Sequence, residues 1–151
     1  MTAFVVKPEP EVLPEIAFEN LTAGKSQSLK DYAGRVVLLN LWATWCAPCL
    51  REMPSLDRLK AAMSGKDFEV VALSIDKGGP EKPKKFFADA GIKALALIQD
   101  KEGKAFAALK IVGMPTTLLI GRDGKEIGRL VGPAEWDSED AKALIRAAIA
   151  R

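Results

Sequence analysis

The sequence predicts an α/β domain in which helices cover both faces of a mixed sheet. Two continuous apolar runs, Val36–Trp42 and Phe68–Ile75, have the pattern of central strands that are covered on both sides. The segment between them has helical spacing, and its length suits a parallel strand–helix–strand unit. Farther along, Thr116–Ile120 and Glu126–Val131 flank an Asp-Gly turn, which indicates an antiparallel hairpin. Together these segments define the fold class.

The chain of 151 residues is long enough for one domain with a substantial core. We place this domain at residues 16–151, after an extended and partly mobile lead-in at residues 1–15. Pro8, Pro10 and Pro14 exclude a helix in the lead-in. The first six residues are too short for a signal peptide, and no apolar run of about 20 residues could span a bilayer. A net charge of +2 does not provide the dense basic face of a nucleic-acid-binding protein.

The first half of the chain begins with a short apolar segment that we assign as a strand, Ile16–Phe18, followed by a turn at residues 21–25. Leu29–Gly34 is predicted to be one helical turn, because a glycine commonly ends a helix. The central strand Val36–Trp42 comes next. The helix at residues 47–63 has apolar residues at helical spacing, and Pro54 within it predicts a kink.

The second half begins with the strand Phe68–Ile75 and a loop rich in glycine and proline. A helix at residues 84–90 would end at Gly91, before a short strand at 95–98 and a helix at 103–109. The hairpin at residues 116–131 precedes the last helix. That helix is predicted at residues 138–150, because apolar residues share one of its faces and Ser138 is a favourable N-cap.

Both cysteines of the chain lie in Cys46-Ala47-Pro48-Cys49, between the central strand and the first long helix. A Cys-x-x-Cys pair in this position is typical of redox proteins. The helix dipole favours a thiolate at Cys46, which we predict to be the nucleophile, and Cys49 would resolve the mixed disulfide. Ala47 and Pro48 are candidate substrate contacts that would also tune the redox potential, and Pro48 suits the first helical turn. A purely structural disulfide would close too short a loop to stabilise the fold much.

The chain has no histidine, which excludes Cys–His catalysis and any metal site with histidine ligands. Two cysteines cannot complete a closed zinc site within one chain. We therefore expect no metal and no cofactor other than the redox-active disulfide of Cys46 and Cys49.

Three segments resemble the TlpA/ResA/CcmG group of membrane-anchored thiol–disulfide oxidoreductases, which have the thioredoxin fold. The segments are Asn40–Cys49, Glu52-Met53-Pro54 and Gly113–Thr117, and the resemblance covers residues 14–150. Residues 77–101 correspond to the central insert of this group. Gly132–Trp136 resembles its TlpA branch in particular. The resemblance implies a thioredoxin fold with an N-terminal extension and a central insert.

The resemblance also implies roles for individual residues. In this group, an acid at the position of Glu52 lies by the active-site sulfurs, where it could hold or pass the proton of Cys49. Plain thioredoxins instead bury an acid at the position occupied here by Asn40. Because Asn40 does not titrate, Glu52 is the better candidate for proton transfer. The alternative for Glu52 is a solvated glutamate near a helix start. Met114-Pro115 would form a cis-proline loop that faces the cysteines and binds a substrate strand through its backbone. Thr116, the next residue, is a candidate contact for the substrate, although it is better explained as a strand residue.

The three tryptophans have different predicted roles. Trp45, next to Cys46, would form a partly exposed apolar ledge for the substrate. Trp42 is expected in the core. Trp136 is expected to pack the last helix.

The resemblance implies a monomeric protein disulfide reductase outside the cytoplasm, in the periplasm where one exists. Its substrates would be proteins whose disulfides must be reduced during assembly of cytochrome oxidase or cytochrome c. Electrons would come from a membrane thiol donor, and a membrane anchor could lie outside these residues. One alternative is a cytosolic thioredoxin-like reductase recycled by a pyridine-nucleotide enzyme. Another is a module that holds copper(I) between its cysteines without redox turnover.

Overall fold

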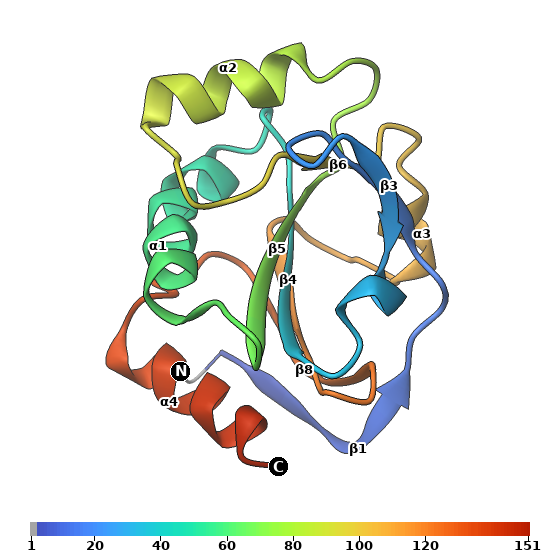
Figure 1. The fold of residues 1–151 in the computed structure, drawn as a ribbon, viewed down its shortest axis with the longest axis vertical. Coiled ribbons are helices and arrows are strands. Elements are labelled where there is room, and N and C mark those ends of the chain that lie inside the picture. Colours follow the sequence, from blue (N-terminus) through green and yellow to red (C-terminus); the bar gives the residue numbers. More distant parts are fainter. Residues whose placement is uncertain (1–2) are drawn as a thin grey trace.

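The computed structural model describes residues 3–151, which fold around a mixed sheet (Figure 1). The sheet has eight strands in the order β1-β8-β7-β4-β5-β6-β2-β3. The strands are β1 (Val5–Val12), β2 (Ala17–Asn20), β3 (Lys25–Ser28), β4 (Val36–Trp42), β5 (Phe68–Ser74), β6 (Ile98–Gln99), β7 (Thr116–Ile120) and β8 (Lys125–Val131). The helices are α1 (Ala47–Met63), α2 (Glu81–Ala90), α3 (Lys104–Ala108), α4 (Glu139–Ile149) and a 3-10 turn, η1 (Leu29–Tyr32).

Helices cover both faces of this sheet, as the sequence predicted. Figure 1 shows α1 and α4 on one face and α3 on the other, with α2 near the start of α1. None of the helices within residues 3–151 is long and apolar enough to cross a membrane.

Strand β4 lies at the centre of the sheet and leads directly to the cysteines. All seven of its residues are buried. It pairs in parallel with β5, from Val36 opposite Phe68 to Trp42 opposite Ser74, and antiparallel with β7. The continuous apolar pattern of β4 is therefore explained by burial on both faces. Trp42 extends the core beyond the strand, where its ring stacks on Phe87 of α2 at 5.6 Å.

Helix α1 has the predicted bounds and continues through Pro54. Its apolar face, which includes Met53, Leu56 and Leu59, is completely buried. Pro48 lies in the first turn, where a proline costs no hydrogen bond. Helix α1 is thereby held rigidly against the sheet, and its first turn carries both cysteines.

The predicted lead-in needs correction, because most of it belongs to the sheet. Strand β1 pairs antiparallel with β8, from Val5 opposite Arg129 to Val12 opposite Lys125. An edge strand tolerates prolines because only one side of it needs hydrogen bonds, and the pairing is irregular between Val6 and Glu11. The domain boundary at residue 16 therefore does not stand. Residues 1 and 2 of the lead-in lie outside the described part.

Other differences concern short elements. Strand β3 was not predicted, because its residues are polar and it pairs only with β2 at the opposite edge. Strand β6 lies later than expected, at Ile98–Gln99, and α2 begins earlier, at Glu81. Gly91 ends α2 in the left-handed conformation, as predicted.

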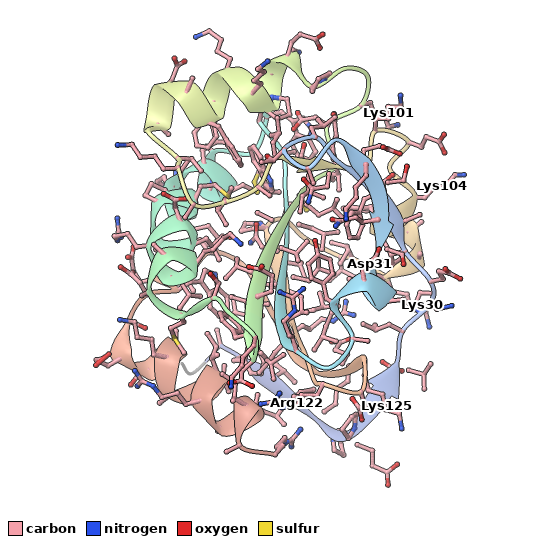
Figure 2. The ribbon with its side chains drawn as sticks, viewed as in Figure 1. Lys30, Asp31, Lys101, Lys104, Arg122 and Lys125 are labelled. Carbon is pink, nitrogen blue, oxygen red and sulfur yellow. A yellow bond between two sulfur atoms is a disulfide. The ribbon has the colours of Figure 1, made fainter. Side chains whose placement is uncertain are left out.

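Arg122 forms hydrogen bonds at the end of the sheet that lies away from the cysteines (Figure 2). Its guanidinium donates to the carbonyl of Gly34 at 3.0 Å, to Asp67 Oδ1 at 3.2 Å and to the carbonyl of Ile149 at 3.1 Å. These bonds join the end of α4 to loops at this end of the sheet. The scaffold is thus fixed at one end, and the candidate site occupies the other.

Candidate active site

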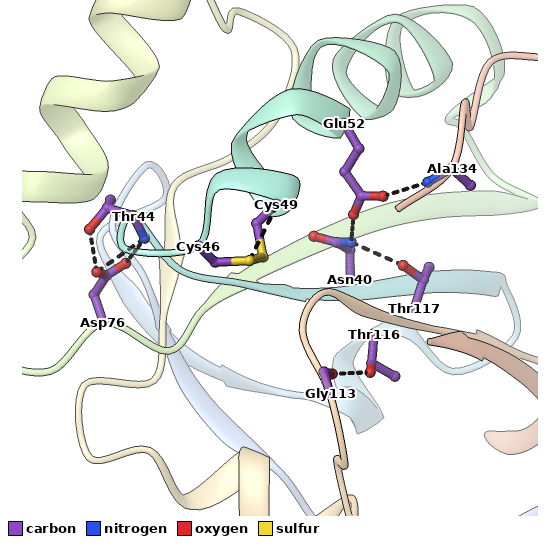
Figure 3. Close-up of a disulfide and its surroundings, with 10 residues drawn as sticks. All are labelled: Asn40, Thr44, Cys46, Cys49, Glu52, Asp76, Gly113, Thr116, Thr117 and Ala134. Carbon is purple, nitrogen blue, oxygen red and sulfur yellow. Dashed lines mark hydrogen bonds between the residues drawn. A yellow bond between two sulfur atoms is a disulfide. The ribbon is translucent and has the colours of Figure 1, made fainter. Parts of the chain in front are cut away.

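Cys46 and Cys49 form a disulfide at the start of α1 (Figure 3). Their Cα atoms are 5.3 Å apart. Cys46 is the N-cap of the helix, and its Sγ accepts a hydrogen bond from the backbone N–H of Cys49 at 3.3 Å. This N–H group, which has no carbonyl partner within the helix, and the helix dipole both stabilise negative charge at the sulfur. The position of Cys46 therefore favours a thiolate when the disulfide is reduced.

The two cysteines differ in accessibility. Cys46 is 6% exposed and Cys49 is completely buried. Next to them, Ala47 is exposed and Pro48 is half-buried. An incoming sulfur can therefore approach Cys46 but not Cys49. This geometry supports the predicted roles of Cys46 as nucleophile and Cys49 as resolving residue.

Glu52 lies one turn after Cys49 and is only 2% exposed. Its Oε1 accepts from Asn40 Nδ2 at 2.6 Å (Figure 3). Its Oε2 accepts from the backbone N–H of Ala134 at 3.0 Å and from Trp136 Nε1 at 3.2 Å. The alternative of a solvated glutamate is therefore excluded.

Burial raises the pKa of Glu52 from 4.5 to about 7. The hydrogen bonds from Ala134, Asn40 and Trp136 act in the opposite direction, because they stabilise the carboxylate. A carboxyl group with a pKa near neutrality can both take up and release a proton under ordinary conditions. Sequence reasoning identified Glu52 but missed the donors Ala134 and Trp136, which come from the loop between β8 and α4. Trp136 is buried as predicted.

The Met114–Pro115 peptide bond is cis, as the resemblance implied. The loop leads into β7, where Thr116 pairs with Leu41, near the end of β4. The carbonyl of Pro115 already accepts from the backbone N–H of Gly132 at 2.8 Å. Met114, the residue before it, is half-buried, and its predicted contact with a substrate stays a prediction.

Thr116 is the first residue of β7, which confirms its preferred assignment as a strand residue over the alternative of a substrate contact. Its side chain is completely buried, and its Oγ1 donates to the carbonyl of Gly113 at 2.6 Å (Figure 3). The hydroxyl therefore shapes the loop and is not available to a substrate in this conformation.

Trp45 is 68% exposed, which makes it a prominent apolar side chain beside Cys46. It contributes to two hollows. One, of about 410 Å³, is also lined by Leu50 and Phe86, and the other, of about 460 Å³, by Ile75 and Phe106. Trp42 is buried in the core, as predicted.

Asp76, which sequence reasoning missed, holds the loop before Cys46. Its Oδ2 accepts from the backbone N–H of Thr44 at 3.1 Å and from Ser74 Oγ at 2.7 Å. Asp76 comes shortly after the apolar strand β5. A carboxylate at the end of a buried strand is the sequence feature that could have identified it. Within residues 3–151 no three histidine, cysteine, aspartate or glutamate side chains converge as metal ligands.

The fold and this site, with a Cys-x-x-Cys disulfide at the start of α1, define a thioredoxin-fold protein with the cysteine pair typical of thiol–disulfide oxidoreductases. The chain belongs to the Redoxin family, whose sequence model matches residues 8–145.

Three similar proteins are consistent with this assignment. The thiol-disulfide oxidoreductase ResA of Bacillus thuringiensis subsp. konkukian (strain 97-27) is 37% identical over 109 residues, which cover 72% of this chain. The match spans only 62% of that relative's length. The structure of a putative thiol:disulfide interchange protein DsbE from Chlorobium tepidum has 31% identity and a TM-score of 0.80, with 96% of this chain and 99% of the other covered.

The structure of the pneumococcal exposed lipoprotein thioredoxin Etrx1 from Streptococcus pneumoniae strain TIGR4 has 26% identity and a TM-score of 0.71. It covers 87% of this chain and 96% of its own. These findings support a ResA/CcmG-like protein. None of the three is a TlpA protein, so the narrower likeness to that branch stays a prediction.

Proposed function

We propose that this chain is a protein disulfide reductase that passes two electrons from a donor dithiol to cysteine pairs of substrate proteins. One observation carries the proposal. A disulfide with one approachable sulfur, Cys46, and one buried sulfur, Cys49, lies at a helix start beside Glu52, whose pKa is about 7. This arrangement supplies a nucleophile, a resolving thiol and a group that can exchange its proton.

The reaction begins with the reduced chain. The Cys46 thiolate attacks a substrate disulfide, the substrate S–S bond breaks, and a mixed disulfide forms while the departing substrate thiolate takes a proton from water. Cys49 then gives up its proton, for which Glu52 is the available base in the site, and attacks Cys46. The second substrate thiolate leaves and is protonated. The substrate gains two electrons and the chain regains its disulfide, which a donor dithiol reduces by the reverse sequence.

Substrate docking would use the surface around Cys46. The exposed ring of Trp45 suits apolar side chains next to the target disulfide, and the flanking hollows combine apolar residues with charged ones such as Lys82, which lines both. The backbone of Met114 would pair with the extended substrate strand. Backbone pairing tolerates different sequences, so several substrate proteins could be served.

The proposal extends to location and partners. The relative from Streptococcus pneumoniae is described as an exposed lipoprotein, which supports a role outside the cytoplasm for the present chain. From the resemblance to the TlpA/ResA/CcmG group, we also propose that a membrane thiol supplies the electrons and that an anchor lies beyond these residues. The proposed substrates are proteins of cytochrome oxidase or cytochrome c assembly.

The reduction potential of the disulfide tests the reductase proposal. Equilibration with glutathione or dithiothreitol, followed by quantification of both redox forms, gives this value. A reductase requires a potential well below about −120 mV, which is the value for the strong oxidant DsbA. A value near that of DsbA would exclude the proposed direction of electron flow.

Partners can be captured with a Cys49→Ser variant, which cannot resolve the mixed disulfide. Disulfide-linked proteins should accumulate on Cys46, whereas the matched Cys46→Ser variant should trap none. Separately, efficient turnover with a pyridine-nucleotide-dependent thioredoxin reductase would contradict the membrane donor and favour a cytosolic reductase.

A further inference from the structure

Asn40 lies in β4 and is completely buried. Figure 3 shows its side chain between Glu52 and the disulfide. Its Nδ2 donates to Glu52 Oε1 at 2.6 Å and to Thr117 Oγ1 at 3.0 Å. Both amide hydrogens are therefore used. Its Oδ1 is also buried, but it has no hydrogen-bond partner within residues 3–151.

The orientation of the amide follows from these contacts. While Glu52 is a carboxylate, turning the amide over would bring Oδ1 against a second acceptor, which is unfavourable. In the structure Nδ2 donates to Glu52 Oε1, and Figure 3 shows Oδ1 turned toward the Cys46–Cys49 disulfide. A disulfide has no hydrogen to donate. In the oxidised chain, a buried acceptor thus faces a group that cannot satisfy it, which is unfavourable.

We propose that reduction supplies the missing donor: the Cys49 thiol donates a hydrogen bond to Asn40 Oδ1. The inference concerns the redox pair itself and does not depend on which protein is the substrate. When a donor dithiol reduces the chain, the S–S bond breaks, two electrons enter, and the donor becomes a disulfide. One of its two protons remains on Cys49, and the other goes to Cys46 or to water. Cys49 is the partner of Asn40, because its buried sulfur favours the neutral thiol.

Asn40 would then control where one proton resides. Its oxygen stabilises the thiol form of Cys49, and its Nδ2 stabilises the carboxylate form of Glu52. Both effects keep the proton on Cys49 rather than on Glu52 in the resting reduced chain. Asn40 would also favour the dithiol over the disulfide, because only the dithiol satisfies Oδ1.

Infrared spectroscopy can detect the proposed bond directly. The chain has two cysteines, so a Cys46→Ser variant contains a single S–H group, that of Cys49. We expect its S–H stretching band at a lower wavenumber than that of a free thiol. Adding Asn40→Leu should return the band to the free position. Adding Thr117→Val as the control removes only an acceptor of Nδ2, so the band should stay shifted.

A band at the free position in the Cys46→Ser protein itself would overturn the proposal without any change at Asn40. If the leucine variant does not fold, Asn40→Asp keeps an oxygen in place of Oδ1 and should retain the shifted band. Loss of the shift in a folded Asn40→Asp protein would count against Oδ1 as the acceptor.

The redox equilibrium gives a second readout in the chain with both cysteines. Asn40→Leu removes one net hydrogen bond from the dithiol and should move the equilibrium with glutathione about fivefold toward the disulfide. This corresponds to a potential about 20 mV more negative. An unchanged equilibrium, or a shift toward the dithiol, would refute the proposal. An oxidising potential of the wild-type chain would reject the reductase function but leave the infrared result intact, so the two failures are distinguishable.

Discussion

The unusual pKa of Glu52 predicts a specific dependence of protein stability on pH. The pKa is 4.5 in an exposed carboxyl and about 7 in the folded chain, mainly because of burial. The folded state therefore holds the proton more tightly than the unfolded state. The stability contribution of Glu52 is fully present below pH 4.5, declines as pH rises, and is lost once pH passes about 7. At 1.36 kcal/mol per pKa unit, the loss is about 3 kcal/mol.

The Glu52→Gln variant isolates this effect, because the amide cannot ionise. We expect the free energy of unfolding of the wild type minus that of the variant to fall by about 3 kcal/mol between pH 4.5 and pH 8. Urea unfolding of both oxidised proteins, followed by circular dichroism and tryptophan fluorescence, measures this difference. Other titrating groups are common to both proteins and cancel.

A Glu9→Gln variant is the control for removing one carboxyl, because Glu9 lies exposed in β1. A wild-type-minus-Glu52→Gln difference that stays constant with pH would refute the reasoning. It would mean that Glu52 titrates as an ordinary carboxyl and that burial does not control its proton.

Three further predictions concern the same site. In a Cys49→Ser variant, Cys46 should react with iodoacetamide faster than a peptide cysteine at pH 6. In a Cys46→Ser variant, Cys49 should react more slowly than that peptide, because it is buried. Equal rates for Cys46 and Cys49 would contradict the helix-dipole argument. Trp136→Phe removes a donor to the Glu52 carboxylate, so the pKa of Glu52 should rise. The loss in the free energy of unfolding, measured by urea titration, should be about 1–2 kcal/mol larger at pH 8 than at pH 5. A loss that does not depend on pH would indicate a packing effect alone. Trp45→Ala should change the free energy of unfolding by less than about 0.5 kcal/mol, because the ring is largely exposed. It should raise KM for a protein disulfide but not for oxidised glutathione. An equal effect on both KM values would show that Trp45 does not take part in substrate docking.

Local patterns were sufficient for the elements that build the centre of the molecule. The apolar run Val36–Trp42 is a strand with the predicted bounds, and the helix at residues 47–63 begins and ends as predicted. Both depend on residues close together in the chain, so their signals are contained in short windows. The same is true of the Cys-x-x-Cys pair, whose place between strand and helix predicted its chemistry.

The edges of the sheet could not be predicted in the same way. Val5–Val12 contains prolines and Lys25–Ser28 is polar, so neither has the pattern of a buried strand. They form strands because β8 and β2 offer them unpaired backbone groups. Pairing of this kind depends on the partner strand, and local sequence does not indicate it.

The sequence by itself determined the class of fold and the redox pair, because short segments of the chain carry both patterns, and the resemblance to a known group pointed to Glu52 as the candidate acid. Only the tertiary structure decided how Glu52 behaves. Its donors are 12, 82 and 84 positions away, at Asn40, Ala134 and Trp136, and no local pattern joins them. The packing that brings them together also removes water from the carboxyl, and this loss of solvation is the main cause of its pKa of about 7.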